Sequence, residues 1–262
     1  MKSTKLKTSF IFLILVSLGL WTATAAQLDS SDLQKKWFEH YKKQPNVPDP
    51  AKMLINGKKE PALEKGFKAL FNGRDIDAWE PIGGDCEFDV VDGAIRGTCK
   101  PGSPSTYLYT KKDDYSDFIF TCEMKWEEEG NSGVMFRAGR GKGKKGGISA
   151  IGPQMEMEPY SQEREWSGGI YGQGCGGWFY PLWLEEHAEA REAQIEKEWN
   201  RITIEARGSS VRTWLNGTPM AFWKTDEFKS GAFGLQVHSG KKGTILWRNL
   251  KVKELKKKKK QQ

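Results

Sequence analysis

Three observations predict that this chain is an all-β protein, a two-sheet antiparallel sandwich with a short helical insertion. Many short segments alternate apolar and polar side chains, as β-strands do. Turns that contain glycine or asparagine separate these segments at regular spacing. The 262 residues also include 29 glycines, 11 tryptophans and 13 phenylalanines, which suits a turn-rich, aromatic-rich sheet protein.

The first 26 residues have the pattern of a secretory signal peptide. Three lysines precede an apolar run from Phe10 to Trp21, and small residues follow as far as Ala26. The run is short for a membrane span, and no other segment reaches the length that a span needs. We therefore expect an exported protein, periplasmic or extracellular, with no stable membrane span once residues 1–26 are removed.

The remaining chain divides into three parts by composition. Residues 27–65 are polar and contain prolines, which predicts an N-terminal arm or linker with a short helix. Residues 66–255 carry the strand patterns, and residues 256–262 form a basic tail that we expect to be disordered. The formal net charge of +7 comes from lysines at the two ends, so the body is close to neutral. Because nucleic-acid binding needs basic residues clustered on the folded domain, we expect no nucleic acid partner.

The strand patterns continue through most of residues 66–255. Asp92-Gly93 and Asn216-Gly217 are two-residue hairpin signals. Residues 184–199 are rich in glutamate and alanine at helical spacing, which predicts the helical insertion. The expected strands lie within 67–79, 86–99, 107–110, 117–126, 131–138, 152–158, 167–171, 199–207, 211–215, 220–223, 231–239 and 244–255.

The chain has four cysteines, and disulfides are common in exported proteins. If the Asp-Gly pair at 92–93 is a hairpin loop, counting outward places Cys86 opposite Cys99. Directly opposed strand residues lie within reach of a disulfide, so we expect this pair to be bridged or adjacent. Cys122 and Cys175 are too far apart in sequence for a prediction, and no metal-ligand spacing is present.

The segment from Gly152 to Glu158 carries the strongest functional signal. Its alternation places Gln154, Glu156 and Glu158 on one strand face and two methionines on the other. Two carboxylates and an amide on one face are costly to cover unless they bind something. The sequence therefore predicts a polar ligand at this face.

Seven short motifs resemble the 3-keto-disaccharide hydrolase domain family over about residues 66–255. They occur in the order Asn131-Ser-Gly-Val-Met-Phe-Arg137, Gly152-Pro-Gln-Met-Glu156, Ser167-Gly-Gly-Ile-Tyr-Gly172, Trp199-Asn200, Leu215-Asn-Gly217, Gly234-Leu-Gln-Val-His238 and Trp247-Arg-Asn-Leu250. The resemblance implies a jelly-roll sandwich like those of concanavalin A and laminarinase. It also implies an exported enzyme that cleaves glycosides already oxidised at C3. The family commonly places an acidic residue two positions before a glutamine, whereas here Gln154 precedes Glu156.

That activity implies abstraction of the C2 proton, formation of an enolate and expulsion of the C1 aglycone, followed in some cases by hydration. Such a reaction needs a base, a group that stabilises the enolate and an acid for the leaving oxygen. His238 is a candidate base or acid, because histidine changes charge nearest to neutral pH. Glu156 is the alternative base, and Arg137 is a candidate for stabilising the enolate or a structural partner of Glu156.

Six further residues are candidates for binding the substrate. Trp178 belongs to an aromatic cluster whose rings suit the apolar faces of sugars, or which simply packs on the sandwich. The others carry polar side chains on predicted strands near the catalytic candidates. The six candidates are Gln154, Glu123, Asn131, Tyr171, Gln236 and Trp178.

No cofactor is certain from the sequence. A divalent metal ion is an open option, with Glu156 and His238 as its ligands. The expected partners are an oligosaccharide or glycoside substrate and an upstream oxidoreductase that oxidises the sugar at C3. The alternative function is a non-catalytic carbohydrate-binding module on the same sandwich, which a site lined only by aromatic rings and amides would favour.

Overall fold

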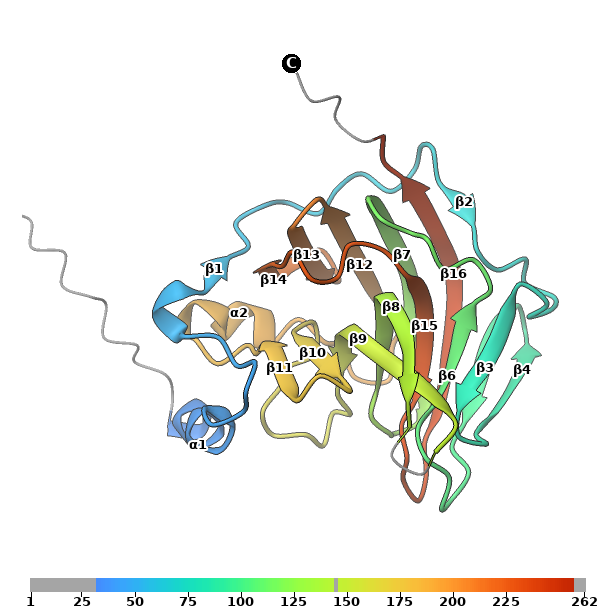
Figure 1. Ribbon diagram of the computed structural model, residues 1–262, viewed down its shortest axis with the longest axis horizontal. Coiled ribbons are helices and arrows are strands. Elements are labelled where there is room, and N and C mark those ends of the chain that lie inside the picture. The colour runs from blue at the N-terminus through green and yellow to red at the C-terminus, as the bar shows by residue number, and fades with distance from the viewer. Residues whose placement is uncertain (1–31, 144–145, 257–262) are drawn as a thin grey trace, which may run out of the picture.

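The computed structural model describes residues 32–143 and 146–256 and confirms an all-β, two-sheet antiparallel sandwich (Figure 1). One sheet has nine strands, of which β2 pairs only with β16. In spatial order its path is β1 (Leu54–Ile55), β14 (Thr218–Lys224), β13 (Ser210–Leu215), β12 (Asn200–Arg207), β7 (Phe118–Glu128), β16 (Thr244–Glu254), β5 (Ala94–Thr98) and β4 (Glu87–Val91), with β2 (Lys68–Ala69) beside β16.

The second sheet has seven strands and carries the segment that the sequence singles out. Its spatial order is β11 (Gly177–Tyr180), β10 (Ile170–Gln173), β9 (Ile148–Met157), β8 (Ser132–Lys142), β15 (Ala232–Val237), β6 (Thr106–Thr110) and β3 (Trp79–Gly83). Strands β8 to β11 are consecutive in the chain, whereas β15 and β6 come from distant parts of it, so the sheet gathers residues far apart in sequence onto one surface.

The helical content is smaller than the sequence predicts. The helix expected over residues 184–199 consists only of a 3-10 turn at Glu185–His187 and α2 (Ala188–Arg191). The other helical elements, α1 (Asp32–Tyr41) and a 3-10 turn at Pro50–Lys52, belong to the arm. Helices this short form few internal hydrogen bonds, so tertiary packing decides where they end.

The hairpin that joins β4 to β5 has the predicted two-residue loop. Both Asp92 and Gly93 have positive φ values, 48° and 75°, as a type I′ turn requires. The strands pair in the predicted register, which brings Cys86 next to Cys99. The two thiols are unbridged and within hydrogen-bonding distance of each other, so the prediction of an adjacent pair is confirmed.

The core lies between the two sheets and is dominated by aromatic and large aliphatic side chains. The ring of Phe233 on β15 lies 4.7 Å from that of Phe118 and 4.6 Å from that of Phe120, both on β7 of the other sheet. Fully burying side chains of this size stabilises a fold by about 1.5–3 kcal/mol each. This packing makes the sheets a rigid frame for the residues on their outer faces.

The N-terminal arm runs along one end of the sandwich and bonds to it repeatedly (Figure 1). The Asn56 amide donates to the carbonyl of Thr213 over 3.0 Å, and the Trp214 indole donates to the carbonyl of Lys58 over 2.8 Å. The predicted signal peptide lies outside the described residues, as does the predicted tail beyond Lys256. None of the helices that the structure describes is long and apolar enough to cross a membrane.

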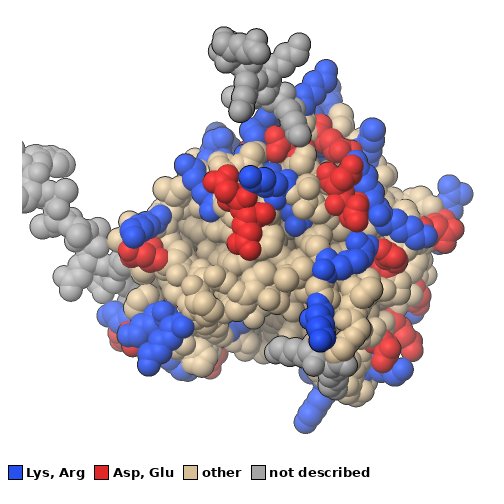
Figure 2. Space-filling view, viewed as in Figure 1, with Lys and Arg blue, Asp and Glu red and all other residues tan. Residues whose placement is uncertain are grey.

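Charged side chains are mixed on the face of the molecule that Figure 2 shows. Lysine and arginine alternate with aspartate and glutamate around the rim, and uncharged residues occupy most of the centre. The view contains no broad basic surface of the kind that binds nucleic acids.

Candidate functional site

Strand β9 and the residue that follows it place three polar side chains on the outer face of the seven-stranded sheet. Met155 and Met157 point into the core and are fully buried, so the residues that alternate with them point to the outer face. Gln154, Glu156 and Glu158 are nevertheless only 0%, 5% and 1% exposed. The alternation predicted from the sequence is therefore present, and the polar face is covered by neighbouring side chains rather than by solvent.

A glycine on the neighbouring strand β8 leaves room for these side chains. Gly133 on β8 pairs with Glu156, and a Cβ atom at this glycine would lie 2.3 Å from the Gln154 amide nitrogen. On the other side the Glu156 backbone N–H donates to the carbonyl of Gly169 over 2.9 Å. Any larger residue at position 133 would displace the amide that contacts the carboxylate.

A row of hydrogen bonds crosses four strands and centres on Glu156. The Asn131 amide donates to Glu156 Oε1 over 2.5 Å, and Gln154 Nε2 lies 3.1 Å from Glu156 Oε2. Gln154 Nε2 also donates to Gln236 Oε1 over 2.7 Å, and Gln236 Nε2 lies 3.1 Å from the Tyr107 hydroxyl. Both carboxylate oxygens of Glu156 are thus held by amides, so its orientation is fixed.

Burial controls the ionisation of Glu156. Removal from water disfavours the charged carboxylate and raises its pKa to about 8, and the negative charge of Glu158 adds to this shift. The hydrogen bond from Asn131 and the charge of Arg164 act in the opposite direction. Glu156 therefore exchanges a proton near neutral pH, as a general acid or base must.

Glu158, two residues further along the strand, has a cationic partner. The Arg164 guanidinium lies 2.5 Å from Glu158 Oε1, and the backbone N–H of Trp166 donates to Oε2 over 2.9 Å. Burial raises the pKa of Glu158, and Arg164 and the backbone N–H oppose that shift. One strand face thus holds one carboxylate bound by amides and one bound by a guanidinium.

His238 and Tyr171 lie on opposite sides of Glu156. His238 follows β15, two residues after Gln236, and its backbone N–H donates to the carbonyl of Asn131 over 3.3 Å. Its side chain is exposed, with Nδ1 2.6 Å from the carbonyl oxygen of Ser239. Tyr171 on β10 pairs with Gln154, is partly buried, and has a pKa raised by burial and by the charge of Glu156. The structure therefore groups Tyr171 with the central carboxylate, whereas His238 is joined to the site through its backbone bond to Asn131.

Arg137 is not brought to this group. It lies at an irregularity of β8 between Met135 and Gly139, with a left-handed backbone at φ 45°. Its guanidinium donates to the carbonyls of Ser116 and Gly208 over 2.7 and 2.8 Å. The side chain is 1% exposed and binds chain segments at the end of the sandwich, so it holds loops together there.

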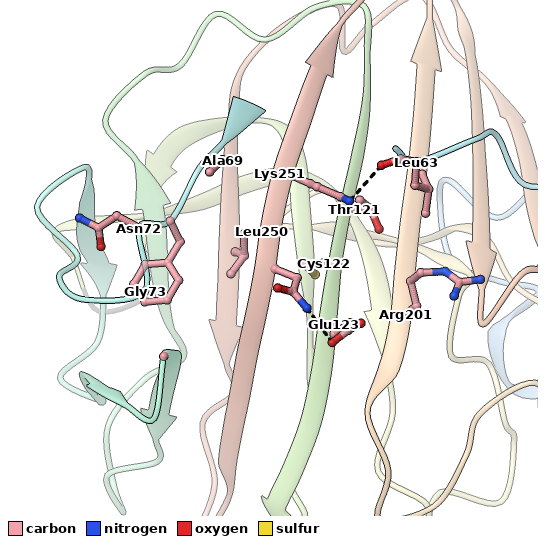
Figure 3. Close-up of a pocket in the computed structure, with 13 residues that line it drawn as sticks. Leu63, Ala69, Asn72, Gly73, Thr121, Cys122, Glu123, Arg201, Leu250 and Lys251 are labelled. Atoms are coloured by element: carbon pink, nitrogen blue, oxygen red, sulfur yellow. Dashed lines mark hydrogen bonds between the residues drawn. The ribbon is translucent and has the colours of Figure 1, made fainter. Parts of the chain in front are cut away.

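Glu123 lies on the opposite side of the molecule, on the outer face of the nine-stranded sheet. Its Oε2 accepts hydrogen bonds from Arg248 Nε over 2.6 Å and from Asn249 Nδ2 over 3.0 Å. Figure 3 shows it beside Arg201 in a surface pocket of about 410 Å³. The whole sandwich separates it from Glu156, so the two carboxylates do not share a ligand.

Trp178 is 1% exposed and packs in the core cluster rather than offering a free ring. Its ring lies 5.0 Å from that of Trp166 and 5.4 Å from that of Tyr171. The other rings predicted to stack on sugars are also at least 93% buried; they are Phe179, Tyr180 and Trp183. These four aromatic residues therefore pack on the sandwich, which is the alternative to sugar stacking that the sequence left open.

The described part of the chain contains no group of three or more histidine, cysteine, aspartate or glutamate side chains that could hold a metal ion. Glu156 is bound by amides, and His238 Nδ1 contacts a backbone carbonyl. Gln154 Oε1 is buried and has no hydrogen-bond partner among the described residues. This acceptor is the one place at the site where the geometry calls for an additional donor.

Two residues of the site, Tyr107 and Arg164, could not be assigned from the sequence. Tyr107 ends the row of amides, and its pKa is raised by burial while the bond from Gln236 opposes the shift. Arg164, the partner of Glu158, lies within the loop between β9 and β10, which carries no strand pattern. Together the site offers a carboxylate with a raised pKa, amides that orient it, and the exposed imidazole of His238 after the neighbouring strand β15.

Many solved structures resemble the sandwich, and two of them illustrate the similarity. A candidate glycosyl hydrolase from Parabacteroides distasonis ATCC 8503 has a TM-score of 0.51 and 21% identity over 76% of this chain and 100% of that chain. A protein of unknown function with a galectin-like fold from Bacillus subtilis has a TM-score of 0.53 and 14% identity over 77% of this chain and 100% of that chain. At these identities the similarity establishes the fold. No curated protein matches the sequence.

The fold and the family together define a carbohydrate-related β-sandwich protein. The model of the 3-keto-alpha-glucoside-1,2-lyase-like domain matches residues 66–253, which is well over half of the chain. The chain therefore belongs to this family, and the resemblance seen in the seven motifs is confirmed. The match begins after the N-terminal arm.

Proposed function

We propose that the protein is an enzyme that cleaves 3-keto-glycosides by elimination at C1 and C2, with Glu156 as the base. The observation that carries the proposal is the state of Glu156. Its carboxylate is 5% exposed, held through both oxygens by amides, and has a pKa of about 8. A group of this kind transfers protons efficiently near neutral pH.

The chemistry follows from the ketone at C3 of the substrate. The ketone acidifies the C2 hydrogen, and the C1 oxygen is β to the carbonyl. Glu156 removes the C2 proton, the electron pair forms an enolate, and its collapse breaks the C1–O bond and releases the aglycone. Addition of water to the resulting double bond would give the free keto-sugar.

His238 is the proposed donor to the enolate oxygen. Its side chain is exposed, and its backbone N–H donates to the carbonyl of Asn131, the residue whose amide binds Glu156. This position supports a role for His238 in contacting a sugar bound over the carboxylate. A donor aimed at a developing oxyanion typically contributes about 10²–10³-fold in rate. The proposal includes export of the protein and an upstream oxidoreductase that makes the 3-keto substrate.

A second candidate function is non-catalytic carbohydrate binding. The observation that favours it is the abundance of neutral donors at the site, where three amides and two phenols surround one carboxylate. They are Asn131, Gln154, Gln236, Tyr107 and Tyr171. Such groups can bind sugar hydroxyls without chemistry.

The deciding experiment offers the purified protein a 3-keto-disaccharide and its unoxidised parent, with and without a chelator. We expect cleavage of the keto-sugar only. Glu156→Gln should lower kcat/KM by about 10³-fold, as loss of a general base does, and His238→Ala by about 10²-fold. Glu254→Gln, at an exposed site that pairs with Lys112, is the matched control. Sugar binding without cleavage would favour the second candidate, and full activity of both site variants would refute the assignment.

A further inference from the structure

The N-terminal arm lies outside the family match, yet it is anchored to the loop that follows β9 and to β11. Gln34 of α1 is 1% exposed and accepts a hydrogen bond from the Trp166 indole over 2.8 Å. The same side chain donates to the carbonyl of Arg164 over 3.2 Å. Three residues after α1, Gln44 Oε1 accepts from the backbone N–H of Trp178 over 3.0 Å. The arm is therefore fixed in place next to β11 by specific polar bonds.

Tyr41, the last residue of α1, is where the arm meets the polar site. Its ring lies 5.4 Å from that of Trp166 and 6.4 Å from that of Trp178. The centre of the Arg164 guanidinium is 5.3 Å from the Tyr41 ring, and its Nη1 donates a hydrogen bond to the Tyr41 hydroxyl. The same guanidinium binds Glu158. Tyr41 is thus joined through one arginine to the carboxylate face of β9.

The Tyr41 hydroxyl also lies within the electrostatic reach of the central carboxylate. Burial raises its pKa, Arg164 opposes this, and the charges of Glu158 and Glu156 raise it further. Tyr171 responds to the charges of both Glu156 and Tyr41. Trp178 packs against both tyrosine rings, which places Tyr41 on the β10 side of Glu156. His238 lies on the other side, beyond β8.

The bond from Arg164 leaves Tyr41 with a hydroxyl proton to donate. A phenol has one O–H donor as well as acceptor capacity, and Arg164 occupies an acceptor position. The side chain is only partly buried, so the hydroxyl is not sealed in the core. A neighbouring guanidinium also stabilises negative charge on the oxygen if the proton is given up.

We propose that Tyr41 is a residue of the active site, supplied by the arm, and that its hydroxyl serves the group that leaves from C1. This inference rests on the proposed function. As Glu156 takes the C2 proton and the C1–O bond breaks, Tyr41 transfers its proton to the departing oxygen. The aglycone leaves as an alcohol, and the phenolate bound by Arg164 later regains the proton that Glu156 took. The aglycone then lies against the arm, and residues 66–253 alone hold an incomplete site.

The test compares Tyr41→Phe with the wild-type protein on two 3-keto-glucosides, one with an alkyl aglycone and one with a p-nitrophenyl aglycone. A good leaving group needs little help from an acid. We therefore expect kcat/KM to fall by about 100-fold for the alkyl glycoside and by less than about 3-fold for the nitrophenyl glycoside. A merely structural role would lower both rates equally.

Two control variants keep the outcome specific. Tyr160→Phe removes a hydroxyl that bonds to the Ile195 carbonyl instead, over 2.6 Å. Phe38→Leu loosens the arm at Trp183, whose ring lies 5.0 Å from that of Phe38, and leaves the Tyr41 hydroxyl in place. Neither variant should change the ratio of kcat/KM for the alkyl glycoside to kcat/KM for the nitrophenyl glycoside. Equal falls for both substrates in Tyr41→Phe, or no fall, would overturn the proposal.

A binding measurement separates this proposal from the proposed function. If the wild-type protein cleaves neither substrate, the elimination mechanism fails, and calorimetry with the unoxidised parent disaccharide decides whether Tyr41 contacts the ligand. Loss of one hydrogen bond should weaken binding by about 5-fold in Tyr41→Phe. An affinity equal to that of the wild-type protein would then reject Tyr41 as a site residue.

Discussion

The two outer faces of the sandwich each hold a glutamate, but in opposite surroundings. On the nine-stranded sheet, the side chain of Glu123 is 28% exposed and pairs with Arg248, itself 41% exposed. On the seven-stranded sheet, Glu156 is 5% exposed and is bound by the amides of Asn131 and Gln154. An exposed ion pair contributes little to stability, whereas a buried carboxylate without a cation against it is costly.

The two faces therefore differ in what their carboxylates cost the fold. Surface pairs such as Glu123 with Arg248 can be removed with little consequence. The face of β9 instead keeps two carboxylates almost out of water, and only Glu158 has a directly bonded guanidinium. Buried groups of this kind are frequent at functional sites.

The largest effect should come from removing the guanidinium that pairs with Glu158. Arg164→Met leaves a carboxylate that is 1% exposed without its cation, which should lower the free energy of unfolding by about 3–5 kcal/mol. The equivalent change on the other face, Arg248→Met, should cost about 1 kcal/mol or less. Urea unfolding of the two variants measures both values, and similar costs would remove the distinction between the faces.

The next effect is the pH dependence that Glu156 imposes on stability. Because its pKa is raised to about 8, the unfolded chain loses this proton before the folded protein does. Folding is therefore favoured below the unfolded pKa, and stability is lost as pH rises toward about 8. Each pH unit in that window costs up to about 1.4 kcal/mol.

Glu156→Gln should abolish this contribution. Relative to the wild-type protein, the variant should gain about 1 kcal/mol per pH unit between about pH 5 and pH 8. Met157→Leu, a neutral change on the core side of the same strand, should keep the wild-type slope. Denaturant titrations at several pH values provide the measurement, and parallel curves for Glu156→Gln would contradict burial of an ionisable group here.

The smallest effect concerns the backbone beside Glu123. Asn249 has a left-handed φ of 54° and donates to Glu123 from an exposed position. Asn249→Gly relieves the backbone cost and loses an exposed hydrogen bond, so stability should change by less than about 0.5 kcal/mol. Asn249→Ala keeps the unfavourable backbone and should cost about 1 kcal/mol. Thermal melts of the pair test this, and a larger loss in the glycine variant would mean that the side-chain bond dominates.

The sequence predicted the fold and the central strand because both depend on local alternation. Side chains two apart on a strand must share a face, which placed Gln154 with Glu156 and Gln236 with His238. The Asp-Gly turn at 92–93 likewise set a register that the structure confirms.

The alternation of apolar and polar residues does not predict side-chain direction where a strand is irregular. It also does not indicate which of the two sheets a strand joins. Arg137 has the right spacing from Asn131, but the left-handed residue inside β8 turns its side chain toward the end of the sandwich. Glu123 has the right parity on β7, yet β7 belongs to the other sheet. Pairing of distant strands determines both outcomes.

Contacts between residues far apart in the sequence could not be predicted from the sequence either. Trp178 is covered because Tyr41 and Arg164 pack over its ring, and 137 positions separate Tyr41 from Trp178. No local pattern indicates that residues of a polar arm return to the aromatic face of β11. The same limitation hid the pairing of Glu158 with Arg164.

The arm has a consequence for self-association. β11 is an outer strand of the seven-stranded sheet, and β14 would be an outer strand of the other sheet without β1. Exposed strand edges invite pairing between molecules. β1 of the arm pairs with β14, and Gln44 occupies the backbone N–H of Trp178 on β11. The arm therefore also covers part of both edges, so we expect that its removal would expose unpaired strand backbone and promote aggregation.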